Sequence, residues 1–418
     1  MTLDVYLGDV LVGKLSGGEG VSFKYTVDNR PISLSMPVRA EPYGDAATRN
    51  FFTNLFFENT QLDEVVAKHG LDRNDIVGIL TYLGRDCPGA ASVVPEGEAP
   101  GKRPGLIASD YETVENEEDL MRRLQMRKLG SDKKDPSPLA GVQGKVAVTL
   151  IDGRLHFPNN GAPTTHILKV PRPVDTSLVA QEYHLLNIAR SVQEHPVVEA
   201  EIYTAGEIDG LLIKRYDRSV ENGQVDRIHQ EDFCQALGLH PMLKYERNGA
   251  HPEFTFTARA VGALLGKTKV PARARQSFLI ATILNLALGN TDNHAKNHSL
   301  IYHESKPVLA PLYDIVPILM DSQVTHDFSF KIGNAEKVQD LTKQDIELLA
   351  TDLGFGRHSR TPIAIEGILN GIAEHIPNLP RPSLRGMAIM LEDQLSVIHE
   401  HIGLGPNFPN RDLFVRSP

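Results

Sequence analysis

The first part of the chain shows two patterns of apolar and polar residues. Apolar and polar side chains alternate over 3–13 and 21–35, and glycines and the Asn29-Arg-Pro31 segment interrupt the alternation. This pattern predicts short strands joined by turns. Over 46–69, in contrast, apolar residues recur at helical spacing, which predicts helices that pack on the sheet. We therefore expect residues 1–95 to form an accessory α+β domain.

The middle of the chain changes from linker composition to a second strand pattern. Residues 96–136 are rich in proline, glycine and charge, which predicts a linker with one short acidic helix near 114–128. A helix is then expected at 178–193, between strands that cover 145–151, 166–170, 198–204 and 210–216. We therefore predict a β-rich lobe over 137–218.

Beyond Arg218 the apolar spacing is mostly helical. The predicted helices cover 230–239, 256–266, 272–289, 342–353 and 384–403. Thr342-Lys-Gln-Asp345 has the form of a capping box. Residues 219–418 are therefore predicted as a helical lobe, which gives an α+β fold in which a β-rich lobe precedes a helical one. Protein kinases hold a nucleotide between lobes of these two kinds, but the order of the lobes supplies only an analogy.

Composition and charge narrow the class of protein. The 418 residues are 41% hydrophobic and 23% charged, which is typical of a globular protein and excludes collagenous and coiled-coil chains. Two cysteines cannot form a disulfide framework, and no apolar run approaches the roughly 20 residues that a membrane helix needs. We therefore expect a cytoplasmic protein that does not insert into membranes. With a net charge of −10, direct contact with nucleic acid would need a local basic patch.

A polar loop after the most apolar predicted helix carries the most informative residues. Asp292 precedes Asn297 with the Asp-x-x-x-x-Asn spacing of the kinase catalytic loop, where the aspartate acts as base and the asparagine binds Mg²⁺. A predicted hairpin of strands 299–302 and 308–312 returns the chain to Asp314, where kinases place a second metal-binding acid. Asn297 and Asp314 offer the oxygen ligands that Mg²⁺ prefers.

Three features upstream fit the same reaction. Ala140-Gly-Val-Gln-Gly-Lys145 contains glycines and could cradle phosphates, although it lacks the ending of a P-loop. Lys169 lies on an apolar strand, where a lone ammonium is costly to bury, and Glu182 on the next helix can pair with it. Lys214-Arg-Tyr216 ends a strand at the position of a kinase hinge. The ordered set predicts a kinase-like nucleotide site.

The same residues are also compatible with simpler structural roles. Asn and Asp are common in turns because they form local hydrogen bonds, so the loop by itself is also consistent with a capped helix and a turn. Taken singly, Lys169 and Glu182 are also consistent with a strand-edge lysine and a solvated helix residue. His294 and His298 are four positions apart with Asp292 nearby, which would suit zinc, but no further ligand follows at a suitable spacing.

A set of short motifs runs along nearly the whole chain. The motifs after residue 160 are Pro163-Thr-Thr-His-Ile-Leu-Lys-Val-Pro171, Lys214-Arg-Tyr-Asp-Arg218, Gln230-Glu-Asp-Phe-Cys-Gln-Ala-Leu-Gly238, Lys244-Tyr-Glu246, Thr291-Asp-Asn-His-Ala-Lys-Asn297 and Leu312-Tyr-Asp-Ile315. Those before it are Phe23-Lys-Tyr25, Ile32-Ser-Leu-Ser-Met-Pro37, Phe51-Phe-Thr-Asn-Leu-Phe56 and Gly84-Arg-Asp-Cys-Pro-Gly-Ala90. Together they resemble the HipA family of bacterial toxin kinases and that family's N-terminal accessory domain.

The resemblance implies a two-lobe protein-kinase-like fold and a serine/threonine kinase that is the toxin of a type II toxin–antitoxin pair. Its substrate would be an aminoacyl-tRNA synthetase, with the glutamyl enzyme favoured, and phosphorylation would arrest translation and yield dormant, drug-tolerant cells. ATP and Mg²⁺ would be the cofactors. A small helix-turn-helix antitoxin would be the partner and would bind operator DNA, with the kinase as corepressor.

The resemblance also assigns roles to residues of this sequence. Asp292 would be the catalytic base, and Asn297 and Asp314 the Mg²⁺ ligands. Lys169, held by Glu182, would bind phosphate. The nucleotide site would further include the phosphate loop, the hinge and two residues near the catalytic loop, namely Ala140, Gly141, Val142, Gln143, Gly144, Lys145, Lys214, Arg215, Tyr216, His294 and Tyr313.

The chain departs from the family at one position. The family's autophosphorylated serine lies two residues before the alanine of the glycine loop, and this sequence has Pro138 there, which has no hydroxyl. Our hypothesis is that the kinase either uses the adjacent Ser137 or lacks this self-inactivation. Mass spectrometry of the 130–145 peptide after incubation with ATP, with Ser137→Ala as control, distinguishes the two.

A small-molecule kinase of related fold and a catalytically silent corepressor stay open as alternative functions.

Overall fold

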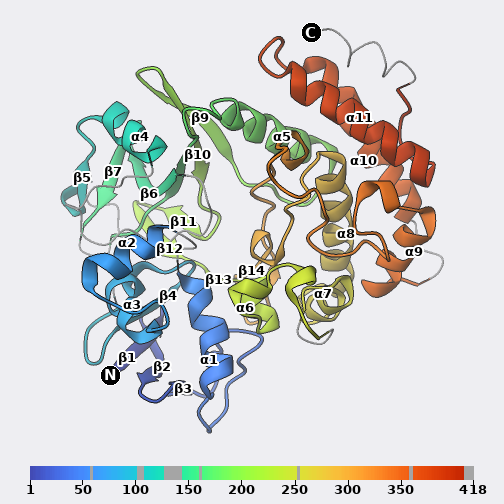
Figure 1. Cartoon of the computed structure of the whole chain (residues 1–418). Coiled ribbons are helices and arrows are strands. Elements are labelled where there is room, and N and C mark those ends of the chain that lie inside the picture. The colour runs from blue at the N-terminus through green and yellow to red at the C-terminus, as the bar shows by residue number, and fades with distance from the viewer. Residues whose placement is uncertain are drawn as a thin grey trace. The chain divides into compact units, whose positions relative to one another are not determined.

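The computed structural model describes residues 1–56, 60–100, 108–126, 144–159, 162–251, 255–356 and 361–408. The chain forms two compact units, whose elements are labelled in Figure 1. The first unit consists of Met1–Thr176, Glu199–Pro241 and Ser299–Ser305, and the second of Ser177–Val198, Met242–His298 and Lys306–Pro418. Each unit therefore combines segments that are far apart in the sequence.

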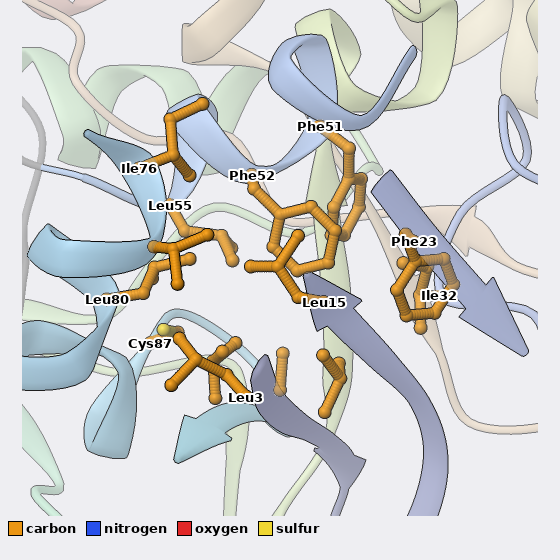
Figure 2. Close-up of a cluster of buried hydrophobic side chains, with 14 of the residues drawn as sticks. Leu3, Leu15, Phe23, Ile32, Phe51, Phe52, Leu55, Ile76, Leu80 and Cys87 are labelled. Carbon is orange, nitrogen blue, oxygen red and sulfur yellow. The ribbon is translucent and has the colours of Figure 1, made fainter. Parts of the chain in front are cut away.

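The first unit begins with a four-stranded antiparallel sheet. Its strands are β1 (Thr2–Leu7), β2 (Val10–Gly17), β3 (Val21–Tyr25) and β4 (Ala91–Pro95), in the order β3-β2-β1-β4. The helices α1 (Asp45–Phe52), α2 (Thr60–His69) and α3 (Ile76–Leu83) follow within the same segment. Figure 2 shows how inward side chains of the strands, such as Leu3 and Leu15, meet Phe52 and Leu80 from the helices. Burial of each such side chain contributes about 1.5–3 kcal/mol.

The predicted strand over 21–35 is wrong in its second half. β3 ends at Tyr25, and the hydroxyl of Tyr25 donates to the carbonyl of Met36 and accepts a hydrogen bond from the amide of Ile32 at 3.0 Å. These two bonds close the segment into a loop, which Pro31 also favours because it has no amide donor for a ladder. The alternation of apolar residues there reflects loop side chains that turn into the core.

A six-stranded antiparallel sheet forms the middle of the first unit. Its strands are β5 (Tyr111–Thr113), β7 (Arg154–Pro158), β6 (Gly144–Ile151), β8 (His166–Val170), β10 (Ile208–Lys214) and β9 (Ala200–Ala205), given in the order of the sheet. Helix α4 (Glu117–Gln125) packs on it through Leu120, Met121 and Leu124. Part of the segment expected as linker therefore belongs to the sheet and its core. β5 is a strand of the sheet, and α4 packs on the sheet because the short acidic helix has one apolar face.

Shorter elements complete the first unit. β11 (Arg218–Glu221) and β12 (Gln224–Arg227) form a hairpin, and β13 (His229–Asp232) pairs antiparallel with β14 (Ser299–Tyr302). The helix expected at 230–239 is therefore wrong in its first third. Helix α6 (Phe233–Leu237) begins only after Asp232, whose side chain caps it in a capping box with Gln235.

The second unit is mostly helical. Its elements are α5 (Leu178–Val192), α7 (Ala258–Leu265), α8 (Pro271–Ala287), β15 (Val308–Leu309), α9 (Lys343–Asp352), α10 (Thr361–His375) and α11 (Arg385–Ile402). Every residue of α8 from Phe278 onward is buried, and α8 contacts α7, α10 and α11. A helix that is apolar on all sides forms the centre of such a bundle. The capping box predicted at Thr342 and Asp345 is confirmed.

Helix α10 is absent from the sequence prediction. Two glycines inside it, Gly367 and Gly371, lower the helical tendency of the segment. Gly371 lies against Val192, where an added Cβ would come within 3.0 Å of a side-chain carbon, so the close packing of α10 on α5 favours glycine there.

Among the described residues, no helix has the length and apolar character that crossing a bilayer requires.

Candidate active site

The end of helix α8 positions the polar loop that follows it. Gly289 adopts a left-handed φ of +75°, which glycine tolerates without strain. The amide of Gly289 donates to the carbonyl of Leu286 at 3.3 Å, and the amide of Asn290 donates to the carbonyl of Asn285 at 2.8 Å. This pair of bonds is the Schellman arrangement that ends a helix sharply. The loop with Asp292 therefore starts from the most buried helix of the unit.

Asp292 and Asn297 lie together in this loop. The side-chain amide of Asn297 donates to the backbone carbonyl of Asp292 at 2.8 Å, and the amide of His294 donates to the same carbonyl at 2.9 Å. The carboxylate of Asp292 accepts a hydrogen bond at Oδ1 from the hydroxyl of Tyr245 at 2.7 Å. Burial raises the pKa of Asp292, and the Tyr245 bond and Lys244 oppose the shift. The structure thus brings the two predicted catalytic-loop residues into direct contact.

Asp314 is held against the same loop. Its backbone carbonyl accepts a hydrogen bond from the side-chain amide of Asn290 at 3.1 Å, and that amide also donates to Oδ1 of Asn285 at 2.7 Å. Asp314 has a positive φ of 59°, which is uncommon for a residue with a side chain and is often found at functional sites. Its negative charge also raises the pKa of Asp292. Asp292, Asn297 and Asp314 therefore belong to one site of the second unit.

The donor atoms of this site suit a hard cation. Because Nδ2 of Asn297 is committed to the carbonyl of Asp292, the remaining polar atom of its side chain is an oxygen. Asp314 contributes a carboxylate, and Mg²⁺ takes one or two protein oxygens of this kind together with phosphate oxygens and water. No group of three or more His, Cys, Asp or Glu side chains in the described ranges could hold a metal ion by itself. The residues fit Mg²⁺ that arrives with a nucleotide.

The two histidines of the loop are buried in apolar or aromatic surroundings. His298 lies against Phe278, with ring centroids 4.8 Å apart, and burial lowers its pKa to about 3. His294 meets the ring of Tyr245 edge-on at 5.2 Å, and burial likewise lowers its pKa to about 3. Both histidines are thus neutral at physiological pH, and neither belongs to a metal-binding group among the described residues.

Tyr313, which was also predicted to line the nucleotide site, donates its hydroxyl to the carbonyl of Lys296 at 2.9 Å.

The other predicted nucleotide residues lie mainly in the first unit. Lys169 is buried on β8, opposite Lys145 of β6, while Glu182 is buried on α5 of the second unit. Their pairing stays a prediction. Gly144 and Lys145 lie at the start of β6. Ser137, Pro138, Ala140, Gly141, Val142 and Gln143 lie outside the described residues.

The predicted hinge has its side chains engaged within the first unit. Lys214 forms an exposed ion pair with Glu199 at 3.1 Å. Arg215 is buried and binds both carboxylate oxygens of Asp217, at 2.9 and 2.8 Å. The hydroxyl of Tyr216 donates to the side chain of Gln230. A role of this segment in nucleotide binding stays a prediction.

Sequence reasoning assigned no role to three residues that shape the site. Tyr245 contacts Asp292, and Asn290 and Asn285 connect the loop to Asp314. For Asn285 a signal was present, since a polar residue inside an otherwise apolar buried helix needs a hydrogen-bond partner. Tyr245 was part of a motif, but its contact with Asp292 spans 47 positions and follows no periodicity.

Two family models and two named relatives match most of this chain. Residues 137–378 match the HipA-like C-terminal domain, and residues 3–94 match the HipA N-terminal domain. One relative is Y4mE of Sinorhizobium fredii, which is named as a kinase. It is 31% identical to this chain over 87% of this chain and 83% of its own length. The serine/threonine-protein kinase toxin HipA of Shewanella oneidensis is 25% identical over 95% of this chain and 93% of its own length.

A solved structure supports the fold separately. It contains HipA of Shewanella oneidensis MR-1 with HipB and its operator DNA, and its matching chain has a TM-score of 0.79 at 24% identity. The match covers 96% of this chain and 97% of that one. The predicted α+β, kinase-like fold with an N-terminal accessory segment is confirmed by this likeness and by the two family matches. The chain belongs to the HipA family of toxin serine/threonine kinases.

Proposed function

We propose that the chain transfers the γ-phosphoryl group of Mg²⁺-bound ATP to a serine or threonine hydroxyl of a protein. The observation that carries this proposal is the joint placement of Asp292, Asn297 and Asp314 in one site of the second unit, in which Asp292 and Asn297 have the Asp-x-x-x-x-Asn sequence spacing of kinase catalytic loops. Lys169 would contact the phosphates with Glu182 as its partner, and the segments 140–145 and 214–216 would complete the nucleotide site together with His294 and Tyr313.

In this mechanism Asp292 takes the proton of the acceptor hydroxyl as that oxygen attacks the γ-phosphorus, the bond from phosphorus to the bridging oxygen breaks, and ADP leaves. Burial raises the pKa of Asp292, which brings a carboxylate closer to the range where it can both accept and release a proton. Asn297 and Asp314 would hold Mg²⁺, which neutralises charge on the phosphate oxygens when it is bound. The contribution of the protein is then mainly the positioning of groups that already have the right charge.

The proposed biological role is that of a toxin with an antitoxin partner. The relative of known structure was solved with HipB and operator DNA, which supports a HipB-like partner that brings this chain to DNA. The substrate would be an aminoacyl-tRNA synthetase, with the glutamyl enzyme favoured, and its phosphorylation in the cytoplasm would arrest translation and growth. This part of the proposal rests on the family resemblance.

The test is transfer of radiolabelled phosphate from ATP into a cell lysate. Asp292→Ala should lower transfer by about 10²–10⁴-fold, which is the usual contribution of a general base. The matched control is Asp352→Ala, because Asp352 is also an aspartate of the second unit but pairs with Arg259 at 2.8 Å on the surface. Mass spectrometry of the labelled band would name the acceptor. Equal labelling by wild type and Asp292→Ala would refute the proposed base.

A further inference from the structure

We propose that Tyr245 is a positioning residue for Asp292. Its hydroxyl donates to Oδ1 of Asp292 at 2.7 Å, while Oδ2 receives no hydrogen bond from a residue in the described ranges. One carboxylate oxygen is therefore anchored, and the other is left for the acceptor hydroxyl. This inference rests on the proposed function, because it assigns to Tyr245 the orientation of the base for the same transfer.

Tyr245 can serve as an anchor because its own backbone is fixed on both sides. The carbonyl of Lys244 accepts a hydrogen bond from the amide of Ala295 in the catalytic loop at 3.1 Å. The amide of Glu246 donates to the carbonyl of Ser329 at 2.8 Å. In turn, the hydroxyl of Ser329 donates to the carbonyl of Thr291 at 2.9 Å, directly before Asp292. Three segments of the second unit thus hold one another in a closed set of bonds.

The ring of Tyr245 is fixed separately from its hydroxyl. The guanidinium of Arg247 lies over the ring at 4.1 Å from the centroid, and the ring of His294 meets it edge-on at 5.2 Å and 80°. A cation over an aromatic face and an edge-to-face ring pair are both attractive. Tyr245→Phe keeps the aromatic ring for these contacts and removes the hydroxyl that donates to Asp292. The substitution therefore tests the hydroxyl while the ring stays in place.

Loss of this donor should affect the rate of transfer more than substrate binding. The χ2 torsion of an aspartate has a broad minimum, so the carboxylate of Asp292 can rotate once Oδ1 loses its partner. Small errors in the position of a reacting group lower rates by up to about 100-fold. We expect Tyr245→Phe to lower kcat about 10–100-fold and to change the KM for ATP less than threefold.

The experiment uses the full chain and measures ADP release together with label transfer into the lysate. The control is Tyr43→Phe. The hydroxyl of Tyr43 is likewise a hydrogen-bond donor, here to the backbone carbonyl of Pro37, and Arg39 lies over its ring at 3.7 Å. Tyr43 lies in the accessory segment, so its variant should keep wild-type kcat. Melting temperatures of both variants report on any general loss of structure.

Each outcome decides between positioning and the alternatives. A fall in kcat with unchanged KM and melting temperature supports the proposal. Unchanged kcat overturns it, an increase in kcat would mean that the hydroxyl of Tyr245 competes with the acceptor, and a parallel loss of ATP affinity and melting temperature would assign a structural role. If the wild type releases no ADP, the proposed function fails and this inference with it. If Asp292→Ala is inactive while Tyr245→Phe is fully active, only the present inference fails.

Discussion

Glu231 is a fully buried carboxylate in the first unit with three hydrogen-bond donors around it. The hydroxyls of Ser33 and Tyr302 and the amide of Leu34 all donate to it, the last at 3.1 Å. Burial raises its pKa from 4.5 to about 7, and the donors reduce the shift only in part. The residue connects a loop of the accessory segment to β13 and β14, so its protonation affects how these parts are held together.

The pKa of Glu231 predicts how stability depends on pH. Between pH 4.5 and about 7 the folded chain binds this proton more tightly than the unfolded chain does. The stability that results is complete below pH 4.5 and is lost as the pH rises through 7. Glu231→Gln is neutral at all pH values, so we expect wild type to lose roughly 1–3 kcal/mol relative to this variant from pH 5 to 7.5.

Urea denaturation of wild type and Glu231→Gln at several pH values measures this difference. Groups that titrate equally in both proteins cancel in the comparison, so what remains belongs to residue 231. Parallel curves of the unfolding midpoint against pH would contradict the prediction, because they would show that Glu231 has the same pKa in the folded and unfolded chains.

Individual residues show where sequence reasoning reaches its limit. Asp292, Asn297 and Asp314 could be predicted as one site because their spacing along the chain is itself the signal, and the structure places them together. Their roles in catalysis and metal binding stay predictions. Tyr245 and Glu231 act through contacts with residues 47 and 198 positions away. Neither hydropathy nor local spacing reports such contacts, since they depend on how the whole unit folds.

At the scale of elements, the turn after α8 determines where the loop that carries Asp292 begins. Gly289 has a φ of +75°, and a Cβ added there would come within 2.7 Å of Sδ of Met390. Gly403, after α11, has a similar φ of +71°, but a Cβ added there would have no atom within 4 Å. The two glycines thus share a backbone conformation and differ in their surroundings.

Alanine substitution at these two glycines separates backbone strain from crowding. A left-handed conformation costs a residue with a Cβ roughly 1–2 kcal/mol, which is the loss we expect for Gly403→Ala. Gly289→Ala should cost more, about 2–3 kcal/mol, because Met390 must also move. Urea unfolding of the two variants measures both losses. Equal losses would show that the side chain of Met390 yields freely, and the loop could then start from an alanine.

Elements with strong periodic patterns were predicted well, and elements defined by pairing were not. α8 and α11 were predicted almost to their ends, and the capping box at Thr342 fixed the start of α9. Strands β7 and β13 were missed because each is short and gains its ladder from a partner strand, β6 for β7 and β14 for β13. For β7 the Asp152-Gly153 pair was an available turn signal, and both residues have positive φ.

At the scale of the whole molecule, a cluster of buried charges joins distant parts of the first unit. Asp217 accepts hydrogen bonds from Arg215, from Arg218 at 2.8 Å and from the amide of Gly89 in the accessory segment at 2.9 Å. Arg218 also donates to the carbonyl of Thr164 at 3.1 Å. The order of domains along the sequence does not show this cluster. Its members come from the accessory segment, from the residues just before β8 and just after β10, and from the hairpin that begins at Arg218.

Neutralising Asp217 should destabilise the first unit strongly. Although burial opposes ionisation, Arg215 and Arg218 hold the pKa of Asp217 well below its usual range, so it is charged in the folded protein. Asp217→Asn removes the carboxylate that pairs with both buried guanidinium groups and leaves Arg218 with the longer pair to Asp86 at 3.8 Å. The loss of one partner from a buried ion pair costs about 3–5 kcal/mol. We expect a lower unfolding midpoint and earlier proteolytic cleavage in both the accessory segment and the six-stranded sheet.

The matched control is Glu199→Gln, which removes the exposed partner of Lys214 in the same unit. Its side chain is 71% exposed, and an ion pair of this kind contributes less than about 1 kcal/mol. The comparison therefore tests burial rather than charge, since each variant removes one negative charge. If Asp217→Asn and Glu199→Gln unfolded at the same urea concentration, the cluster would not join the parts of the unit. If cleavage of the accessory segment alone were faster, the sheet would be stable without it, and the first unit would consist of two independently folding parts.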